Sequence, residues 1–154
     1  GLELSMDQPL DDAFTAALSF SWGDYRFDDF TDADGNEFNN NHIPGIPRYQ
    51  LFASLDYQPR AKLSTLLSAR WTGKRYADNA NTAKADGYVV VGIHGSYRTT
   101  LAGSQVRLYA GIDNLFDQEY DDNLRINAAG GRFFEPAPER GLFLGVSVTG
   151  RPGR

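Results

Sequence analysis

Apolar and polar residues alternate along most of the chain with a period of two. From Phe14 to Trp22 the even positions are mostly large and apolar, while the odd positions are small or polar. The alternation returns in five later segments, at 50–57, 63–72, 88–98, 106–112 and 142–149, and a short segment at 2–6 is also compatible with it. A period of two is typical of a strand with one apolar face. The pattern predicts seven strands, an all-β antiparallel fold and no helix.

The segments between these strands alternate between short and long. DQPLDD, QPRAK and RTTLAGSQ have the length of hairpin turns. The stretches that begin at Asp24, Gly73 and Asn114 are much longer and are rich in polar residues. A soluble sandwich has no reason to place all its long loops at one end. Transmembrane β-barrels of the outer membrane do so, with short periplasmic turns and long external loops.

The length of the apolar runs agrees with a membrane span. A run of eight positions, as from Phe14 to Trp22, covers ~26 Å at ~3.3 Å per residue. A tilt of ~45° gives roughly 19 Å of height, a little under the ~25 Å apolar band of such barrels. Aromatic residues stand at both ends of the runs, namely Tyr57 and Tyr97 near short turns and Trp22, Trp71, Tyr25 and Tyr76 near long loops. They are interpreted as membrane girdles, although aromatics also fill sandwich cores.

Composition excludes several function classes. The 154 residues include no Cys, which leaves neither disulfides nor thiolate metal sites. A formal net charge of −5 without a basic stripe argues against a nucleic-acid partner. No apolar stretch is long enough for a transmembrane helix, and the N-terminus does not look like a signal peptide. An exported protein with this sequence would have lost its targeting signal or would be a piece of a longer chain.

No catalytic constellation stands out in the sequence. The hydrolase and metalloprotease motifs with known spacing are absent, and there is no Cys nucleophile. Pairs of carboxylates occur at Asp121–Asp122 and at Glu135 and Glu139, where solvated loop charges are the simpler interpretation than an acid–base pair. We therefore expect no enzyme activity and no cofactor.

Metal-binding patterns are weak as well. The segment that starts at Asp32 begins like a calcium loop, but Glu37 stands where Gly is required and Ile43 where Glu is required. An Asp-Gly-Asn turn explains it equally well. His42 and His94 are isolated, and a lone His is usually a hydrogen-bonding group rather than a ligand. No metal site is expected.

The last third of the chain reads GIDNLFDQEYDDNLRINAAGGRFFEPAPERGLFLGVSV. It resembles the C-terminal end of TonB-dependent outer-membrane receptors, in which an Asn-Leu-Phe-Asp-x-x-Tyr motif follows the penultimate strand and a Gly-Arg pair precedes the last one. The matching residues are Asn114, Leu115, Phe116, Asp117, Tyr120, Gly131 and Arg132. IPGIPRYQLFASLDY and GKRYADNANTAKADGYVVVGIHGSYR are similar to late-barrel segments of the same family, so the resemblance covers essentially the whole chain.

The resemblance implies both a fold and a function. The family forms a 22-stranded transmembrane β-barrel with an N-terminal plug inside. Residues 1–154 would be the C-terminal part, about the last seven strands, with the plug and the earlier strands absent from this chain. The implied function is active transport of a ferric siderophore or similar metal chelate across the outer membrane of a Gram-negative cell. Lipid surrounds the wall, and TonB would act through the absent N-terminal part.

One departure from the family pattern lies at the end of the chain. The family usually ends in an aromatic residue that the barrel-assembly machinery reads. This chain instead ends in VTGRPGR. We therefore expect either an extension beyond the last strand or a different assembly signal.

Basic side chains supply the candidate ligand contacts. Arginine suits anionic, oxygen-rich ligands because its donors form a rigid fork. Arg70, Lys74, Arg98 and Arg107 fall on the polar side of the pattern, while Arg75, Arg125, Arg132 and Arg140 lie in or beside long loops. The candidate ligand-binding residues are Arg75, Tyr120, Arg125, Asn127 and Arg132. The alternative is that these arginines pair with acids of the loops and wall.

A different class of function stays open on the sequence alone. A small self-contained β-barrel or sandwich, acting as a binding module or a structural anchor, would also show strands with a period of two. A protein that is monodisperse without detergent would favour this alternative, since alternate residues could not then face lipid.

Overall fold

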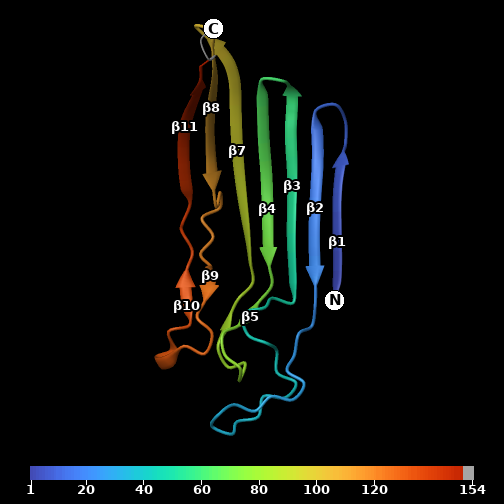
Figure 1. Cartoon of the computed structure of the whole chain (residues 1–154), viewed down its shortest axis with the longest axis vertical. Coiled ribbons are helices and arrows are strands. Elements are labelled where there is room, and N and C mark those ends of the chain that lie inside the picture. The colour runs from blue at the N-terminus through green and yellow to red at the C-terminus, as the bar shows by residue number, and fades with distance from the viewer. Residues whose placement is uncertain (151–154) are drawn as a thin grey trace.

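The computed structural model describes residues 1–150. Within them, seven long strands form one antiparallel sheet, in which each long strand pairs with the next long strand along the chain (Figure 1). These are β1 (Leu2–Pro9), β2 (Phe14–Trp22), β3 (Tyr49–Arg60), β4 (Leu63–Thr72), β7 (Tyr88–Leu101), β8 (Ser104–Asp113) and β11 (Gly141–Thr149). The seven predicted strands are confirmed, and several extend beyond the predicted segments. Residues 151–154, the last part of the expected C-terminal extension, lie outside the described residues.

The long segments contain short elements that the alternation does not predict. β5 (Arg75–Tyr76) pairs with β6 (Lys84–Ala85), β9 (Asp121–Leu124) pairs with β10 (Phe134–Pro136), and a 3-10 turn covers Ala129–Gly131. Strands of two to four residues are too short for a period of two to be visible. Within residues 1–150, no helix is long and apolar enough to cross a membrane.

The strand register collects the large apolar side chains on one face of the sheet, which we call the apolar face. Residues directly opposite each other in an antiparallel pair project to the same side. One such row contains Ala16, Leu55, Leu67, Ile93, Ile112 and Leu142, and another contains Phe20, Leu51, Trp71 and Val89. Leu67 remains 42% exposed and Leu142 75% exposed. Leu18, Leu55, Leu67 and Ile93 therefore do not form a dry interior, which agrees with a face turned toward lipid.

The opposite face, which we call the polar face, carries mostly small and hydrophilic residues. Its rows include Ser54 with Ser68 and Arg98 with Arg107. Two glycines on this face leave room for aromatic rings: a Cβ at Gly145 would lie 2.2 Å from the Tyr109 ring, and one at Gly111 would lie 2.5 Å from Phe143. The Tyr109 and Phe143 rings thus occupy the space over these glycines that a side chain would otherwise fill.

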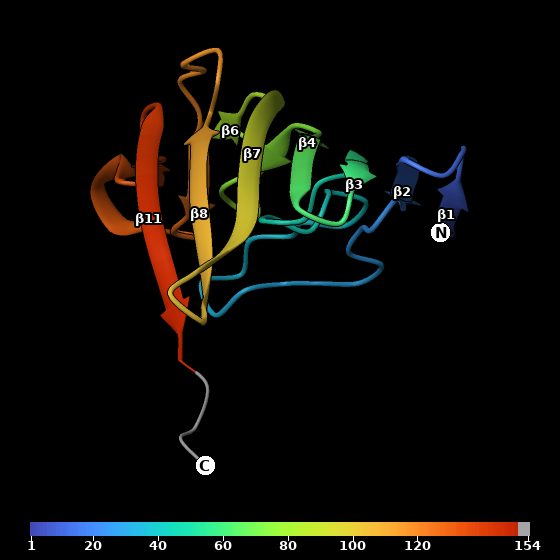
Figure 2. The same cartoon turned by 90° about the horizontal axis from the view of Figure 1, so that it is seen from above.

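The sheet is a single curved layer, as Figure 2 shows from above. β1 and β11 are its two edges within the described residues, so these residues do not close a barrel by themselves. A sandwich would require a second sheet packed on the first, whereas the other two sheets of residues 1–150 are two-stranded pairs in the loops. Neither form of the self-contained alternative is observed.

The three long loops, 23–48, 73–87 and 114–140, lie at one end of the sheet, and the tight turns lie at the other (Figure 1). The predicted alternation of short and long connections is confirmed. The buried apolar residues that cluster together in the described part of the chain are Ala77, Ala85 and Leu124, all of them in these loops. The loops are thus assembled around a small core of their own, beyond the end of the wall.

The predicted aromatic girdles are only partly as expected. At the long-loop end Trp71 packs against Tyr49, with ring centroids 4.7 Å apart, and at the short-turn end Tyr57 stacks on Phe14 at 4.5 Å. Tyr76 instead stacks on His42 inside the loops, at 5.5 Å. Its position in β5, away from the long strands, removes it from the apolar face.

Candidate functional site

The Asn-Leu-Phe-Asp segment is the turn that ends β8. Asn114 and Asp117 both have positive φ angles, 50° and 56°, a conformation that Asn and Asp adopt more readily than most residues. The side chain of the buried Asn114 accepts a hydrogen bond from the Gln118 backbone N–H and donates one to the Gln118 carbonyl, each at 2.9 Å. The Leu115 N–H donates to the carbonyl of Val91 in β7 at 2.7 Å. The motif therefore turns the chain sharply while keeping it attached to the sheet.

The same motif closes the loop that it opens. Asp117 accepts a hydrogen bond from the N–H of Arg140, just before β11, and its other oxygen lies 3.4 Å from the Arg140 guanidinium. Phe116 is 73% exposed and therefore does not belong to a buried core. Asn114 and Asp117 therefore stabilise the fold of this loop.

Loop 73–87 lies between the other two loops and binds both. On one side, Asn81 accepts a hydrogen bond from the His42 N–H (2.7 Å) and donates one to the His42 carbonyl (2.8 Å). On the other side, Asn127 accepts from the Asn79 N–H, and its own N–H donates to the Ala77 carbonyl, both at 2.9 Å. The three loops therefore form one hydrogen-bonded assembly, in which loop 73–87 is the central member.

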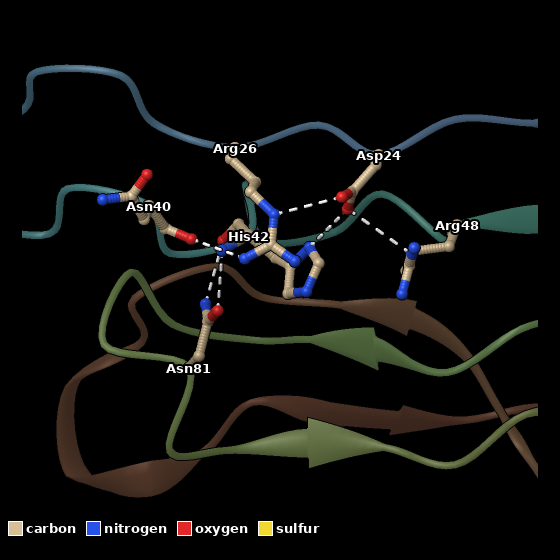
Figure 3. Close-up of polar contacts among 6 residues, drawn as sticks. All are labelled: Asp24, Arg26, Asn40, His42, Arg48 and Asn81. Atoms are coloured by element: carbon tan, nitrogen blue, oxygen red, sulfur yellow. Dashed lines mark hydrogen bonds and ion pairs between the residues drawn. The ribbon is translucent and has the colours of Figure 1, made fainter. Parts of the chain in front are cut away.

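Loop 23–48 contains a cluster of charged side chains around Asp24 (Figure 3). Its carboxylate lies 3.1 Å from Arg26, 3.3 Å from His42 Nδ1 and 3.4 Å from Arg48. The hydrogen bond from Arg26, joined by the nearby charges of Arg48 and His42, holds the pKa of Asp24 below its usual value against the opposing effect of desolvation. The Arg26 guanidinium also donates to the carbonyl of Asn40 at 2.7 Å. The cluster fixes the fold of this loop.

The pKa of His42 lies below its usual value in this cluster. Its burial, together with the positive charge of Arg26, lowers its pKa, and the neighbouring Asp24 does not compensate. Its ring stacks on Tyr76 and its backbone is held by Asn81. His42 therefore joins two loops, through the stacking of its ring and the hydrogen bonds of its backbone.

A second cluster lies where the polar face meets the loops. The rings of Tyr88, at the start of β7, and Tyr120 are 4.2 Å apart, and Tyr88 is only 6% exposed. The Arg70 guanidinium lies 5.7 Å from the centre of the Tyr88 ring, and Nη2 is 3.5 Å from both the Tyr120 hydroxyl and Asp122 Oδ1. Burial raises the pKa of the Tyr120 hydroxyl. This arrangement presents a cation and a protonated phenol at the rim of the polar face.

Arg70 also borders a depression on the polar face. It is shared with Ser19, Ser21, Gln50 and Phe52 and has a volume of about 220 Å³. Half of the Arg70 side chain is exposed, and its two polar contacts are long. An oxygen-rich anion could therefore reach its guanidinium from the polar-face side.

The five predicted ligand-binding residues are not brought together in one place. Arg75 donates to the carbonyls of Asp121 and Asp122, so it ties loop 73–87 to β9. Tyr120 belongs to the Arg70 cluster. Arg125, 3.8 Å from Glu135, is mainly exposed, and Asn127 connects loops. Arg132 follows the 3-10 turn and is exposed.

Three members of this cluster, Arg70, Tyr88 and Asp122, are absent from the predicted ligand-binding residues. Tyr88 and Asp122 are separated by 34 positions in the sequence, and their side chains meet at 3.3 Å only because β9 folds back over the start of β7. The available signal was the position of Tyr88 and Arg70 on the polar side of their strands. That signal identified Arg70 as wall-lining, but it could not bring Tyr120 next to it.

The part of the chain that the structure describes holds no group of three or more His, Asp or Glu side chains suited to a metal ion. In the segment that begins like a calcium loop, Asp32 instead receives hydrogen bonds from the Asp34 and Asn36 N–H groups and from the Asn36 amide. These bonds hold the pKa of Asp32 below its usual value. The segment is a polar turn stabilised by its first residue.

Comparison with known proteins identifies the family. Residues 1–115 match the TonB dependent receptor-like β-barrel model. The ferrichrome outer membrane transporter/phage receptor of Escherichia coli is 33% identical over 115 residues, which cover 68% of this chain and 15% of that protein. The ferric enterobactin receptor of Pseudomonas aeruginosa is 34% identical over 93 residues, covering 54% and 12%. The chain thus spans a small part of the length of these relatives.

Solved structures show the same fold across nearly the whole chain. The ferric citrate transporter FecA superposes with a TM-score of 0.75 at 19% identity, covering 90% of this chain and 21% of that one. BauA, the ferric preacinetobactin receptor of Acinetobacter baumannii, gives a TM-score of 0.74 at 19% identity, covering 95% and 21%. The relatives are receptors and transporters rather than enzymes. With residues 1–115 of 154 matched, the chain belongs to the TonB-dependent receptor β-barrel family and is part of an outer-membrane protein.

Proposed function

We propose that this chain is the C-terminal part of the barrel of an active transporter for a ferric siderophore or a similar metal chelate. Its sheet supplies a stretch of the barrel wall, and its loops supply part of the external surface that receives the ligand. The relatives that carry this inference are named for ferrichrome and ferric enterobactin. The chain corresponds to about the last seven strands of a 22-stranded barrel, and TonB acts through a part of the protein that precedes it.

The observation that carries the proposal is the division of the sheet into two faces with all long loops at one end. An uncovered apolar face suits hydrocarbon, and a polar face suits a water-filled passage. The passage side ends at the long-loop end in the cluster of Arg70, Tyr88 and Tyr120, where the loops begin. A ligand bound by the loops would thus meet a cation and a hydroxyl at the entrance to the passage.

The ligand contact suggested by this geometry is charge-assisted hydrogen bonding. The exposed portion of the Arg70 guanidinium, with the protonated Tyr120 hydroxyl beside it, can donate to the oxygens of an anionic chelate. Arg132 and Arg125 stand further out on loop 114–140 and are exposed to an arriving ligand. Arg75 and Asn127 contribute indirectly, because they hold the loops in place.

Uptake by intact cells tests the function. A strain that lacks the full-length gene should grow poorly when iron is supplied only as the transported chelate, and the gene on a plasmid should restore growth. A panel of radio-iron chelates, such as hydroxamate, catecholate and citrate complexes, identifies the class that is taken up. Equal uptake of every chelate with and without the gene would contradict the proposal.

A further inference from the structure

The wall beside Arg70 carries almost no charge. The strand register gives the two rows of the polar face nearest the long loops, which are Ser19, Phe52, Arg70 and Val90, and Ser21, Gln50, Thr72 and Tyr88. Arg70 is the one charged residue in these rows, and Asp122 Oδ1 lies 3.5 Å from its guanidinium. The wall next to the loops therefore has a net charge close to zero.

The depression beside Arg70 offers neutral groups to a ligand. Its side chains include the hydroxyls of Ser19 and Ser21, the amide of Gln50 and the ring of Phe52, which is 44% exposed. The hydroxyls and the amide can donate hydrogen bonds to the metal-bound oxygens of a ferric chelate. The one positive charge among these groups, on Arg70, already has a counter-ion.

The long loops add a surplus of negative charge. Together they contain fourteen Asp and Glu residues but eight Lys and Arg residues. Residues 27–41, in the middle of loop 23–48, include five of the acids and neither Lys nor Arg. A surplus of one sign at the mouth of a passage repels ligands of the same sign and lowers their local concentration.

Most of the loop cations are also occupied by the protein itself. Five of the eight form ion pairs with loop carboxylates, namely Arg26, Arg48, Lys84, Arg125 and Arg140. Arg75 is bonded to two backbone carbonyls. Among residues 1–150, Lys74 and Arg132 are left with neither kind of partner. The part of the entrance that this chain supplies is therefore poor in cations that could neutralise a ligand.

Ferric chelates differ in net charge even though all of them present oxygens. Three hydroxamates carry one negative charge each and cancel the charge of Fe³⁺, whereas three catecholates carry two each and leave three negative charges. A strongly anionic chelate would lose hydration in the depression and find a guanidinium that is already paired, which is costly. A chelate with little net charge avoids this cost, and its oxygens still accept hydrogen bonds from Arg70 and Tyr120.

We propose that the site formed by Arg70, Tyr120 and the depression beside them selects ferric chelates of low net charge, of the trihydroxamate class, over strongly anionic tris-catecholates. The inference rests on the proposed transport function and narrows its substrate class. It is carried by the charge balance of the wall and loops.

A matched set of ligands separates the effect of charge from that of shape. A linear ferric trihydroxamate with a terminal ammonium can be acetylated or succinylated, which gives cationic, neutral and anionic forms around one iron centre. Quenching of Trp fluorescence in the full-length receptor in detergent measures their affinities. The neutral and cationic forms should bind alike, and a ferric tris-catecholate should bind about tenfold more weakly or worse at low salt. Tighter binding of the tris-catecholate, or of the succinylated form over the acetylated one, would overturn the proposal.

Asp122→Asn tests the charge balance directly. The amide retains an oxygen for the Tyr88 hydroxyl, now at 3.3 Å from Oδ1, but it leaves Arg70 without a counter-ion. The affinity for the tris-catecholate relative to the neutral trihydroxamate should rise about fivefold, the effect of one partly exposed charge contact. Asp86→Asn removes the same charge from an 88% exposed side chain in loop 73–87 and should leave this ratio unchanged.

An unchanged ratio in Asp122→Asn, or an equal rise in Asp86→Asn, would contradict the proposed selection by charge. Cellular uptake separates this failure from that of the transport function. Uptake that prefers the tris-catecholate refutes the charge selection alone. Absence of uptake for every ferric chelate refutes the transport function, and the charge selection with it.

Discussion

The side chain of Asp117 accepts a hydrogen bond from the backbone N–H of Arg140 at 2.9 Å, and it thereby joins the two ends of loop 114–140 across 23 positions of sequence. The contact fixes where β11 begins relative to the end of β8. It also explains why an acid follows Asn-Leu-Phe in this chain: the turn needs a residue that tolerates a positive φ and can accept a hydrogen bond from a distant N–H.

Asp117→Ala should therefore loosen the loop and leave the sheet intact. The lost acceptor and the positive φ together should cost about 1–2 kcal/mol. Hydrogen exchange should become faster in residues 114–140 and stay unchanged in β7 and β8. Asp117→Asn retains an acceptor and tolerates the φ angle, so it should behave nearly like the wild type. Equal exchange in the Ala variant and the wild type would show that the contact does not close the loop.

A lysine introduced on the apolar face of β4 should impair membrane insertion, whereas one on its polar face should not. Leu67→Lys places an ammonium in the middle of the apolar face, where a cation at the bilayer midplane costs about 2–4 kcal/mol. The amount of folded, membrane-inserted receptor should fall. Ser68→Lys, one position further along on the polar face, should insert normally. Similar heat-modifiable gel mobility and yield for both variants would refute the assignment of the apolar face to lipid.

Replacement of Arg75 should change the order of loop 114–140, whereas replacement of Arg132 should change the affinity for the ligand. Arg75→Ala removes two hydrogen bonds to the β9 backbone, so it should raise proteolysis of loop 114–140 even without ligand. Arg132→Ala changes an exposed side chain on that loop, so its effect should be confined to the affinity for the ferric chelate. Limited proteolysis and binding titrations on the same two preparations separate the roles. An Arg132→Ala receptor with wild-type affinity removes that residue from the ligand-binding set.

Acidification should loosen loop 23–48. The pKa of His42 is held below its usual 6.5 by burial and by Arg26, so the unfolded loop binds a proton more readily than the folded one. Stability is thus fully present above pH 6.5 and falls as the pH drops through and below that value. The lowered pKa of Asp24 adds a further loss, but only as the pH falls below 3.8.

Hydrogen exchange at pH 7.5 and at pH 5.5, corrected for the intrinsic pH effect, measures this loosening. Loop 23–48 should lose protection at the lower pH, together with the part of loop 73–87 around Asn81. His42→Gln cannot take up a proton in this range and should show little difference between the two conditions. A variant that retains the full pH response would assign it to another group.

The sheet was predictable from sequence because its two faces are in different environments. Each strand repeats the same alternation, and the register observed between Leu55, Leu67 and Ile93 follows once strands pair in chain order. Tyr49 was not included in the predicted girdle, since it stands just before the alternating segment that starts at Gln50. Strand ends are set by hydrogen bonds and turns, which the alternation does not contain.

The loops were less predictable because their contacts join residues that are distant in sequence. Asn81 and His42 are 39 positions apart, and Arg70 and Asp122 are 52 apart. Residue type indicated that Arg75 would bind oxygen, and it does, but the oxygens are backbone carbonyls of β9. Distinguishing a carbonyl of the protein from an oxygen of a ligand requires the folded loop.

Every long strand in the sheet of residues 1–150 lies beside its nearest long-strand neighbours in chain order. A gene segment that encodes two consecutive strands and their tight turn can therefore be duplicated or deleted without changing how the remaining strands pair. Duplicating such a two-strand segment would widen the barrel and leave every other loop on its original side of the membrane. Losing one strand would reverse the sidedness of all that follow, so lineages with this architecture should change in size by even steps.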